Sequence, residues 1–305
     1  MRNVERIGFV GLGMMGAPMA ERLSQAGYQL FLADADHARE SALVTRLGAT
    51  RLDGGSAASL DLLITMLPNS NIVESVLLGD GRTGGLARSL PAGATVIDMS
   101  SSEPARSRRL AETLSELRLD YLDAPVSGGV KRAIDGSLAI LVGGDKDVLA
   151  GYHVVLTQMG KTIFHIGAAG TGHAAKALNN YVSAAALVAT VEALHVATRF
   201  GIDPAVMTDV LNASSGRSNT TENKVKQFML SGTFASGFAL QLMNKDVKIA
   251  RALADGVGYP MQLGETCSEM WDEAAQRSTP ATDHTEMYRL LAARDSEPVA
   301  QEVKA

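Results

Sequence analysis

The chain has 305 residues, of which 46% are hydrophobic and 20% charged, and its formal net charge at pH 7 is −5. A chain of this length exceeds the usual size of one compact domain and predicts two, with room for a large core. The negative charge disfavours nucleic acid as the main partner, so we expect a small-molecule ligand.

Short apolar runs rich in Val, Ile and Leu occupy the first half of the chain, with helix-like stretches or turn residues between them. Such runs are typical of strands buried on both faces of a mostly parallel sheet. The intervening crossovers predict a doubly wound α/β domain over residues 1–165. The runs are RIGFV at 6–10, YQLFLA at 28–33, LLITML at 62–67, ATVIDM at 94–99, YLDAPV at 121–126, LAILVG at 138–143 and KTIFHIG at 161–167.

The first strand is followed by a GxGxxG pattern and then by an amphipathic helical stretch. Gly11 permits a tight turn, Gly13 lets the backbone approach a pyrophosphate, and Gly16 lets the helix pack on the strand. The pattern alone is weak evidence for a ligand site, but the strand before it and the helix after it predict a dinucleotide site. We expect cofactor contacts from the whole loop: Gly11, Leu12, Gly13, Met14, Met15 and Gly16.

Asp34 lies 18 residues beyond Gly16, at the end of the next predicted strand. A carboxylate at this interval can hold the ribose hydroxyls of NAD and repels the 2′-phosphate of NADP. NAD is therefore the favoured cofactor, while Arg39 leaves NADP as an alternative. Asp34 also has a plain interpretation as a turn-forming residue.

The loops after three later strands carry further candidate site residues, and each loop also has a purely structural interpretation. Met66, Leu67, Pro68 and Asn71 lie where a strand-end loop meets a bound nucleotide, although LPNSN can also cap the next helix. In DMSSSEP at 98–104, the hydroxyls of Ser100 and Ser101 either face the cofactor or cap a helix that begins at Pro104. In DAPVSGG, Ser127 and the amides of Gly128 and Gly129 suit a substrate carboxylate, with a β-turn as the alternative.

From His173 to Phe200 the chain lacks Gly and Pro, which predicts one long helix and the start of an all-helical domain over 166–293. Glu192 and His195 interrupt its apolar run, so we interpret it as a buried helix and expect no membrane span. We predict further helices at 204–212, 219–230, 242–255, 261–276 and 284–293, and a disordered tail at 294–305. The single cysteine and a start without a signal-peptide pattern predict a cytoplasmic protein.

The segment GTGHAAKALNN places Lys176 and Asn180 four residues apart, on one face of the long helix. A lysine held beside a cationic nicotinamide is disfavoured as ammonium and suits general acid/base duty. Most helical lysines, however, are simply solvated. His165, His173 and His195 lack the spacing of a metal pair, so we expect structural or solvated histidines and no metal.

With these motifs, the sequence resembles the 3-hydroxyisobutyrate dehydrogenase family of β-hydroxyacid dehydrogenases, related to the 6-phosphogluconate dehydrogenases. The resemblance covers nearly the whole chain. It rests on GFVGLGMMG at 8–16, LPNSNIVESVLLG at 67–79, DMSSSEP, DAPVSGGVKRAIDGSLAILVGG at 123–144, GTGHAAKALNN at 170–180 and NKDVKIA at 244–250.

The resemblance implies a Rossmann domain, an all-α domain after it, and homodimers or homotetramers formed through the helical part. It implies that Lys176 is catalytic, that Ser127, Gly128, Gly129 and Asn180 bind substrate, and that Ser101 borders nicotinamide, where threonine is more usual. Lys245 is implied to close over the cofactor. Lys131, Arg132 and Ile134 depart from the commonest family pattern, which leaves the substrate open. Arg217 or Asn219 can bind a distal polar group, unless residues 218–219 only begin a capped helix.

We therefore expect an NAD-dependent oxidoreductase that interconverts a small β-hydroxy acid and its semialdehyde or keto acid. Alternatives are a 2-hydroxy-3-oxopropionate (tartronate semialdehyde) reductase or another short-chain semialdehyde reductase. An imine reductase is disfavoured by Lys176. A non-catalytic NAD-binding protein is disfavoured by the Lys176 and Asn180 pair.

Overall fold

A computed structural model describes residues 4–79 and 84–292. The chain divides into two compact units, residues 1–176 and 177–305. The expected boundary near Ile166 precedes this division, because the first turns of the long helix are bonded into the first unit, as described below. The tail expected at 294–305 lies outside the described residues.

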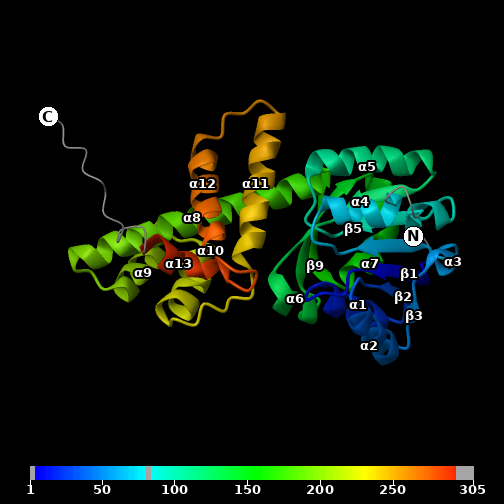
Figure 1. The fold of residues 1–305 in the computed structure, drawn as a ribbon, viewed down its shortest axis with the longest axis horizontal. Helices are drawn as coiled ribbons and strands as arrows, with labels where there is room; N and C mark the ends of the chain where they lie inside the picture. Colours follow the sequence, from blue (N-terminus) through cyan, green and yellow to red (C-terminus); the bar gives the residue numbers. More distant parts are fainter. Residues whose placement is uncertain (1–3, 80–83, 293–305) are drawn as a thin grey trace. The chain divides into compact units, whose positions relative to one another are not determined.

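The first unit is built on one nine-stranded sheet of strand order β3-β2-β1-β4-β5-β6-β8-β7, with β9 paired to β8 (Figure 1). Strands β1 to β6 are parallel, as is the β8–β9 pair, whereas β8 runs antiparallel to β6 and β7. The doubly wound, mostly parallel sheet predicted from the sequence is thus confirmed. The strands are β1 (Arg6–Val10), β2 (Gln29–Ala33), β3 (Thr50–Arg51), β4 (Leu62–Thr65), β5 (Thr95–Asp98), β6 (Asp120–Asp123), β7 (Val126–Ser127), β8 (Leu138–Gly144) and β9 (Gly160–Gly167).

Helices cover both faces of this sheet and bury two separate apolar clusters. One cluster packs Met19 of α1, Leu43 of α2 and Leu156 of α7 against strand residues such as Phe9. The other packs Val73 of α4 and Leu110 of α5 against Leu63. Strands β1, β4 and β5 contribute to both clusters, which explains their uninterrupted apolar sequences. The helices are α1 (Gly16–Gln25), α2 (His37–Leu47), α3 (Gly54–Ala57), α4 (Ser70–Leu78), the 3-10 turn η1 (Leu86–Ser89), α5 (Pro104–Glu116), α6 (Gly129–Asp135) and α7 (Lys146–Thr157).

The second unit is helical around one core in which Trp271, Leu187 and Val247 are fully buried. The helix expected over 219–230 is divided, because the backbone changes from α10 to a π-helix, η2, at Lys224. The elements after the first unit are α8 (Thr171–Phe200), which begins in that unit, then α9 (Pro204–Ala213), α10 (Asn219–Asn223), η2 (Val225–Leu230), α11 (Leu240–Gly256), α12 (Gln262–Gln276), the 3-10 turn η3 (His284–Glu286) and α13 (Met287–Ala292).

Among the described helices, α8 alone is long and apolar enough to cross a membrane, a test that core helices of soluble proteins also pass. Its side chains Ala184, Leu187, Val191 and Leu194 are completely buried in the core of the second unit. Asn180, also on α8, is buried against a carboxylate of α11. We therefore interpret α8 as a core helix.

Candidate functional site

The carboxyl ends of five neighbouring parallel strands lie level at one edge of the sheet. Val10 of β1 is in register with Ala33 and Thr65, Thr65 with Asp98, and Asp98 with Asp123. The chain order of the strands reverses between β1 and β4, and open α/β sheets bind ligands outside the carboxyl ends at such a point. The loops expected to bind the dinucleotide, except the later Lys245, follow these strand ends.

The loop between β1 and α1 has the backbone geometry that a pyrophosphate requires. Gly11 has a φ of +97°, and a Cβ there would lie 2.3 Å from the carbonyl oxygen of Met66. A Cβ on Gly16 would lie 1.8 Å from the carbonyl oxygen of Gly11. At Gly13, by contrast, nothing lies within 4 Å of the Cβ position, so the backbone is open to a close ligand. No side chain caps α1, so its first amides suit a phosphate, and the residues present fit a dinucleotide.

The three other residues of this loop have different surroundings. Leu12 is buried, so only its backbone can face a ligand. Met15 packs partly against the core below the sheet, whereas Met14 is 71% exposed. Their contacts with the cofactor remain predictions.

Asp34 directly follows β2 and is bonded to the glycine-rich loop. Its Oδ2 accepts a hydrogen bond from the Leu12 amide at 2.6 Å, and its Oδ1 accepts one from the Asp36 amide at 2.8 Å. Arg39 Nη1 lies 3.4 Å from the same Oδ1. The turn-forming interpretation is thus confirmed. The ribose contact remains a prediction that this position, between loop and arginine, supports.

Asp34→Asn is expected to weaken the use of NAD and to improve the use of NADP, because the substitution removes the charge that repels a 2′-phosphate beside Arg39. A charged hydrogen bond contributes about 1.5–3 kcal/mol, so kcat/KM for NAD should fall at least about tenfold. Steady-state kinetics with both cofactors measures this. Asp36→Asn is the control, because it removes the other carboxylate that contacts Arg39 and keeps Asp34. Equal cofactor ratios in the two variants would contradict the assignment.

The loop after β4 combines helix capping with contacts to its neighbours. Asn69 caps α4 by accepting from the Ile72 amide, so the capping interpretation is confirmed. The Leu67 amide donates to Ser100 Oγ at 2.8 Å, and the carboxamide oxygen of Asn71 accepts from Arg106. Ser100 is therefore a buried residue that connects the two loops, and contact of its hydroxyl with the cofactor stays a prediction. Cofactor contact by Met66, Leu67, Pro68 and Asn71 stays a prediction.

The first turn of α8 is fixed to the carboxyl edge by Asp123, the last residue of β6. One carboxylate oxygen accepts from the Gly170 amide at 2.7 Å and the other from the His173 amide at 2.8 Å. Burial raises the pKa of Asp123, while the neighbouring His173 and these two amides oppose the rise. Sequence reasoning quoted Asp123 within a motif without giving it a role. Its place within a predicted strand run, as the first residue of the DAPVSGG motif, was the available signal.

Ser127 lies four residues beyond Asp123, at the end of β7. It pairs with Ala139 of β8, and α6 begins two residues later at Gly129. Gly128 and Gly129 have φ values of +134° and +70°, a conformation that glycine adopts without strain. The segment is therefore a strand-to-helix corner and not the expected β-turn alternative. Its glycines expose backbone amides beside the Ser127 hydroxyl, which suits an anion.

Lys176 and Asn180 are on one face of α8, as their spacing predicted. Lys176 is partly buried, and Asn180 is only 6% exposed. The Asn180 amide donates to Asp246 Oδ2 of α11 at 2.6 Å, and Lys245 Nζ lies 3.4 Å from Oδ1 of the same carboxylate. Asp246 thus orients two predicted site residues, and sequence reasoning missed it although it follows Lys245 in the NKD motif.

Asp246→Asn is expected to lower kcat/KM for the hydroxy acid about tenfold, because the Asn180 amide loses its charged partner. Cofactor binding should change less. Asp272→Asn is the matched control, since Asp272 likewise accepts from an asparagine of α11, Asn244, at 2.8 Å. Steady-state kinetics of both variants tests this, and a larger loss in the control would refute the role of Asp246.

The remaining candidates are engaged in the structure. Ser218 caps α10 with a capping box, which confirms the capped helix start, and Arg217 contacts Glu222. His165 and His195 bond to the carbonyl oxygens of Gly144 and Tyr288, so they are structural, as predicted. Within residues 4–79 and 84–292, no group of three or more His, Cys, Asp or Glu is placed to hold a metal.

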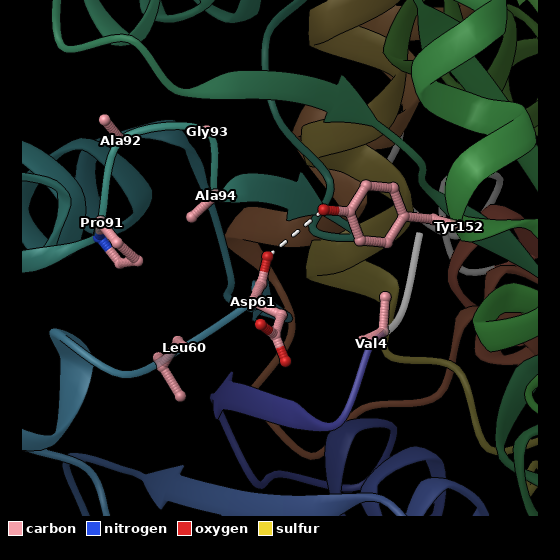
Figure 2. A pocket seen from close by; sticks show the side chains of 8 residues that line it. All are labelled: Val4, Leu60, Asp61, Pro91, Ala92, Gly93, Ala94 and Tyr152. Atoms are coloured by element: carbon pink, nitrogen blue, oxygen red, sulfur yellow. Dashed lines mark hydrogen bonds between the residues drawn. The ribbon is translucent and has the colours of Figure 1, made fainter. Parts of the chain in front are cut away.

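A small hollow lies at the amino ends of the strands, opposite the candidate site. Figure 2 shows residues that line it: Tyr152 of α7, Leu60 and Asp61, which precede β4, and Ala94, which precedes β5. The Tyr152 hydroxyl donates to the Asp61 carbonyl oxygen at 3.3 Å. This hollow belongs to the wrong edge of the sheet for a nucleotide, so it has no part in the site.

Two family models match the chain. The NAD binding domain of 6-phosphogluconate dehydrogenase matches residues 6–167, and the NAD-binding domain of NADP-dependent 3-hydroxyisobutyrate dehydrogenase matches residues 170–291. Together they span both compact units.

Characterised relatives match over most of their length. The 2-(hydroxymethyl)glutarate dehydrogenase of Eubacterium barkeri is 36% identical, covering 89% of this chain and 90% of the relative. The 3-hydroxyisobutyrate dehydrogenase of Pseudomonas aeruginosa is 35% identical, covering 95% and 99%. Among solved structures, Mycobacterium tuberculosis 3-hydroxyisobutyrate dehydrogenase with L-serine superposes with a TM-score of 0.87 at 29% identity, covering 95% of this chain and 99% of the other.

Proposed function

Because the chain belongs to the 3-hydroxyisobutyrate dehydrogenase family of NAD(P)-dependent oxidoreductases that act on CH–OH donors, we propose that it oxidises a small β-hydroxy acid, with Lys176 as general acid/base. The product is the corresponding semialdehyde or keto acid. The observation that carries the proposal is the anchoring of the first turn of α8, just before Lys176, to the sheet edge that bears the dinucleotide loop.

Each step has a named group in the chain. The Ser127 hydroxyl and the amides at Gly128 and Gly129 bind the substrate carboxylate. Lys176 accepts the hydroxyl proton in oxidation and returns it in reduction, while Asn180 holds the reacting oxygen. Bound NAD supplies the hydride acceptor at C4 of its nicotinamide. Ser101 lies beside that ring, and Lys245 closes over the cofactor.

NAD is the proposed preferred cofactor within the NAD(P) class, because Asp34 follows β2 and contacts the glycine-rich loop. Arg39 beside it is the reason to test NADP as well.

The substrate is tested with a panel of acids, each with NAD and NADP. The panel contains 3-hydroxyisobutyrate, L-serine, L-threonate, 4-hydroxybutyrate, 2-(hydroxymethyl)glutarate, and glycerate with tartronate semialdehyde. We expect turnover of at least one β-hydroxy acid or its semialdehyde. NAD binding without turnover of any member would overturn the proposed activity.

The panel also separates the rival reductases. A preference for tartronate semialdehyde over the other members would indicate a 2-hydroxy-3-oxopropionate reductase of the same family. A cyclic imine is assayed beside the panel, and turnover of the imine with none of the acids converted would indicate an imine reductase, which the lysine at position 176 disfavours.

We also propose that the chain forms homodimers or homotetramers through its helical unit. Large apolar side chains remain exposed there, including Phe200 at 84%, Val196 and Leu263 at 67%, and Val182 at 63%. Exposed apolar surface of this kind is typical of an interface. Sedimentation analysis measures the mass, and a monomer at micromolar concentration would contradict the proposal.

A cytoplasmic location is proposed because the sole cysteine, Cys267, is buried and unpaired.

A further inference from the structure

His173 is a completely buried imidazole at the start of α8, and its ring joins three segments of the first unit. Its Nδ1 lies 2.7 Å from Ser107 Oγ of α5, and its Nε2 lies 3.1 Å from the carbonyl oxygen of Ser100. A carbonyl oxygen only accepts, so Nε2 carries the proton and donates to Ser100. The bond from Nε2 to Ser100, in the loop after β5, therefore determines which ring nitrogen carries the proton.

The loop that His173 holds is the one that borders the cofactor site. Ser100 Oγ accepts from the Leu67 amide at 2.8 Å, which connects the β5 loop to the β4 loop. The Ser100 amide in turn donates to Asp98 Oδ1 at 3.0 Å. Ser101, proposed to lie beside nicotinamide, is the next residue. Ser100 is thus held by three hydrogen bonds, through its hydroxyl, its amide and its carbonyl oxygen, and of these the bond from His173 is the one that comes from α8.

His173 is also three residues before Lys176, nearly one turn of the same helix. Its own amide is bonded to Asp123, as described above, so neither end of the residue is free to shift. Carboxylate oxygens of Asp98 and Asp123 lie 3.8 Å and 3.7 Å from Nε2 and Nδ1, too far for hydrogen bonds, so the ring's bonds are those to Ser100 and Ser107.

We propose that His173 is a positioning residue for the reaction, whose Nε2–H bond to Ser100 fixes the distance between Lys176 and the nicotinamide side of the cofactor site. It touches neither substrate nor cofactor. The inference rests on the proposed function, because it assumes that Lys176 transfers the proton. Misplacement by about 1 Å costs on the order of 100-fold in rate, so a single buried bond can have a large effect.

Two substitutions separate this role from general packing. Gln places its amide nitrogen near the Nε2 position, so His173→Gln keeps the donor to Ser100. Asn is shorter and places its amide near the Nδ1 position, so His173→Asn keeps a contact to Ser107 and loses the bond to Ser100. We expect His173→Asn to lower kcat about 10- to 100-fold and His173→Gln to lower it less than about threefold.

The accompanying readouts separate positioning from loss of stability. In His173→Asn, the deuterium isotope effect on kcat for the C–H bond being broken should rise, because hydride transfer becomes slower than product release, while the Kd for NAD changes little. His195→Asn is the matched control, because it removes the Nε2 bond that His195, on the same helix but in the second unit, makes to the Tyr288 carbonyl oxygen at 2.9 Å. It should lower the unfolding temperature and leave the isotope effect unchanged.

A measurement without turnover completes the test. Amide hydrogen exchange at Leu67 and Ser101 should accelerate in His173→Asn and not in His173→Gln. Normal kcat and normal exchange in His173→Asn, or an equal loss of kcat in His195→Asn, would overturn the inference alone. A wild-type chain that turns over none of the acids would overturn the proposed function, and unchanged exchange rates would then overturn this inference as well.

Discussion

Lys176→Ala is expected to lower kcat by about 10²- to 10⁴-fold, the usual contribution of a positioned general acid/base. The Kd for NAD should stay near the wild-type value, because the glycine-rich loop and Asp34 are distant in sequence and bonded to each other without the lysine. Stopped-flow measurement of NADH formation with the best acid of the panel gives the rate, and fluorescence titration gives the Kd.

Lys176→Arg is the informative companion. Arginine keeps the positive charge but does not release its proton at neutral pH, so it should be nearly as inactive as alanine. If arginine restored most of the rate, charge and not proton transfer would be the contribution of this position. Wild-type turnover in the alanine variant would remove Lys176 from the mechanism.

The second large effect is expected from alanine substitutions at two glycines of the β1–α1 loop, which should affect stability and NAD binding differently. Gly16→Ala places a methyl group against the Gly11 carbonyl oxygen, so the loop must shift and both stability and NAD binding should be lost. Gly13→Ala meets no protein atom and should leave the unfolding temperature unchanged. It should still weaken NAD binding at least about tenfold, because the methyl group takes the space of the pyrophosphate.

Thermal unfolding and NAD titration of both variants measure this difference. Gly256→Ala is the control, because Gly256 also has nothing within 4 Å of its Cβ position but lies at the end of α11. It should bind NAD normally. A Gly13→Ala variant with wild-type NAD affinity would place the pyrophosphate elsewhere.

The sequence predicted the sheet well, because its parallel strands are buried on both faces and therefore appear as uninterrupted apolar runs. The two-residue strand β3 carries no such run and was missed. The antiparallel direction of β8 was missed for another reason: strand direction depends on the connection, and LAILVG has the same composition in either direction. The π-helix at 225–230 was expected as a continuous α-helix, since its apolar spacing is helical in both forms.

The candidate site was predictable where a motif has a backbone requirement, as at Gly11 and Gly16. It was not predictable where a residue acts through another. Asp123, Asp246 and His173 each hold a neighbour that is far away in sequence, and the sequence alone does not show which polar residues pair. The hydrogen bond from the Leu67 amide to Ser100 Oγ joins residues 33 apart in sequence and shows the same limit.

The position of the division within α8 has a consequence for engineering. Lys176 is the last residue of the first unit, which also holds the dinucleotide loop and the Ser127 corner, whereas Asn180 and Lys245 belong to the second. The division therefore falls between Lys176 and Asn180, which are proposed to act on the same reacting oxygen. A chimera that joins residues 1–176 to the helices of a relative would keep the proposed proton-transfer lysine and carboxylate-binding corner of this chain, and would take the residue at position 180 from the relative.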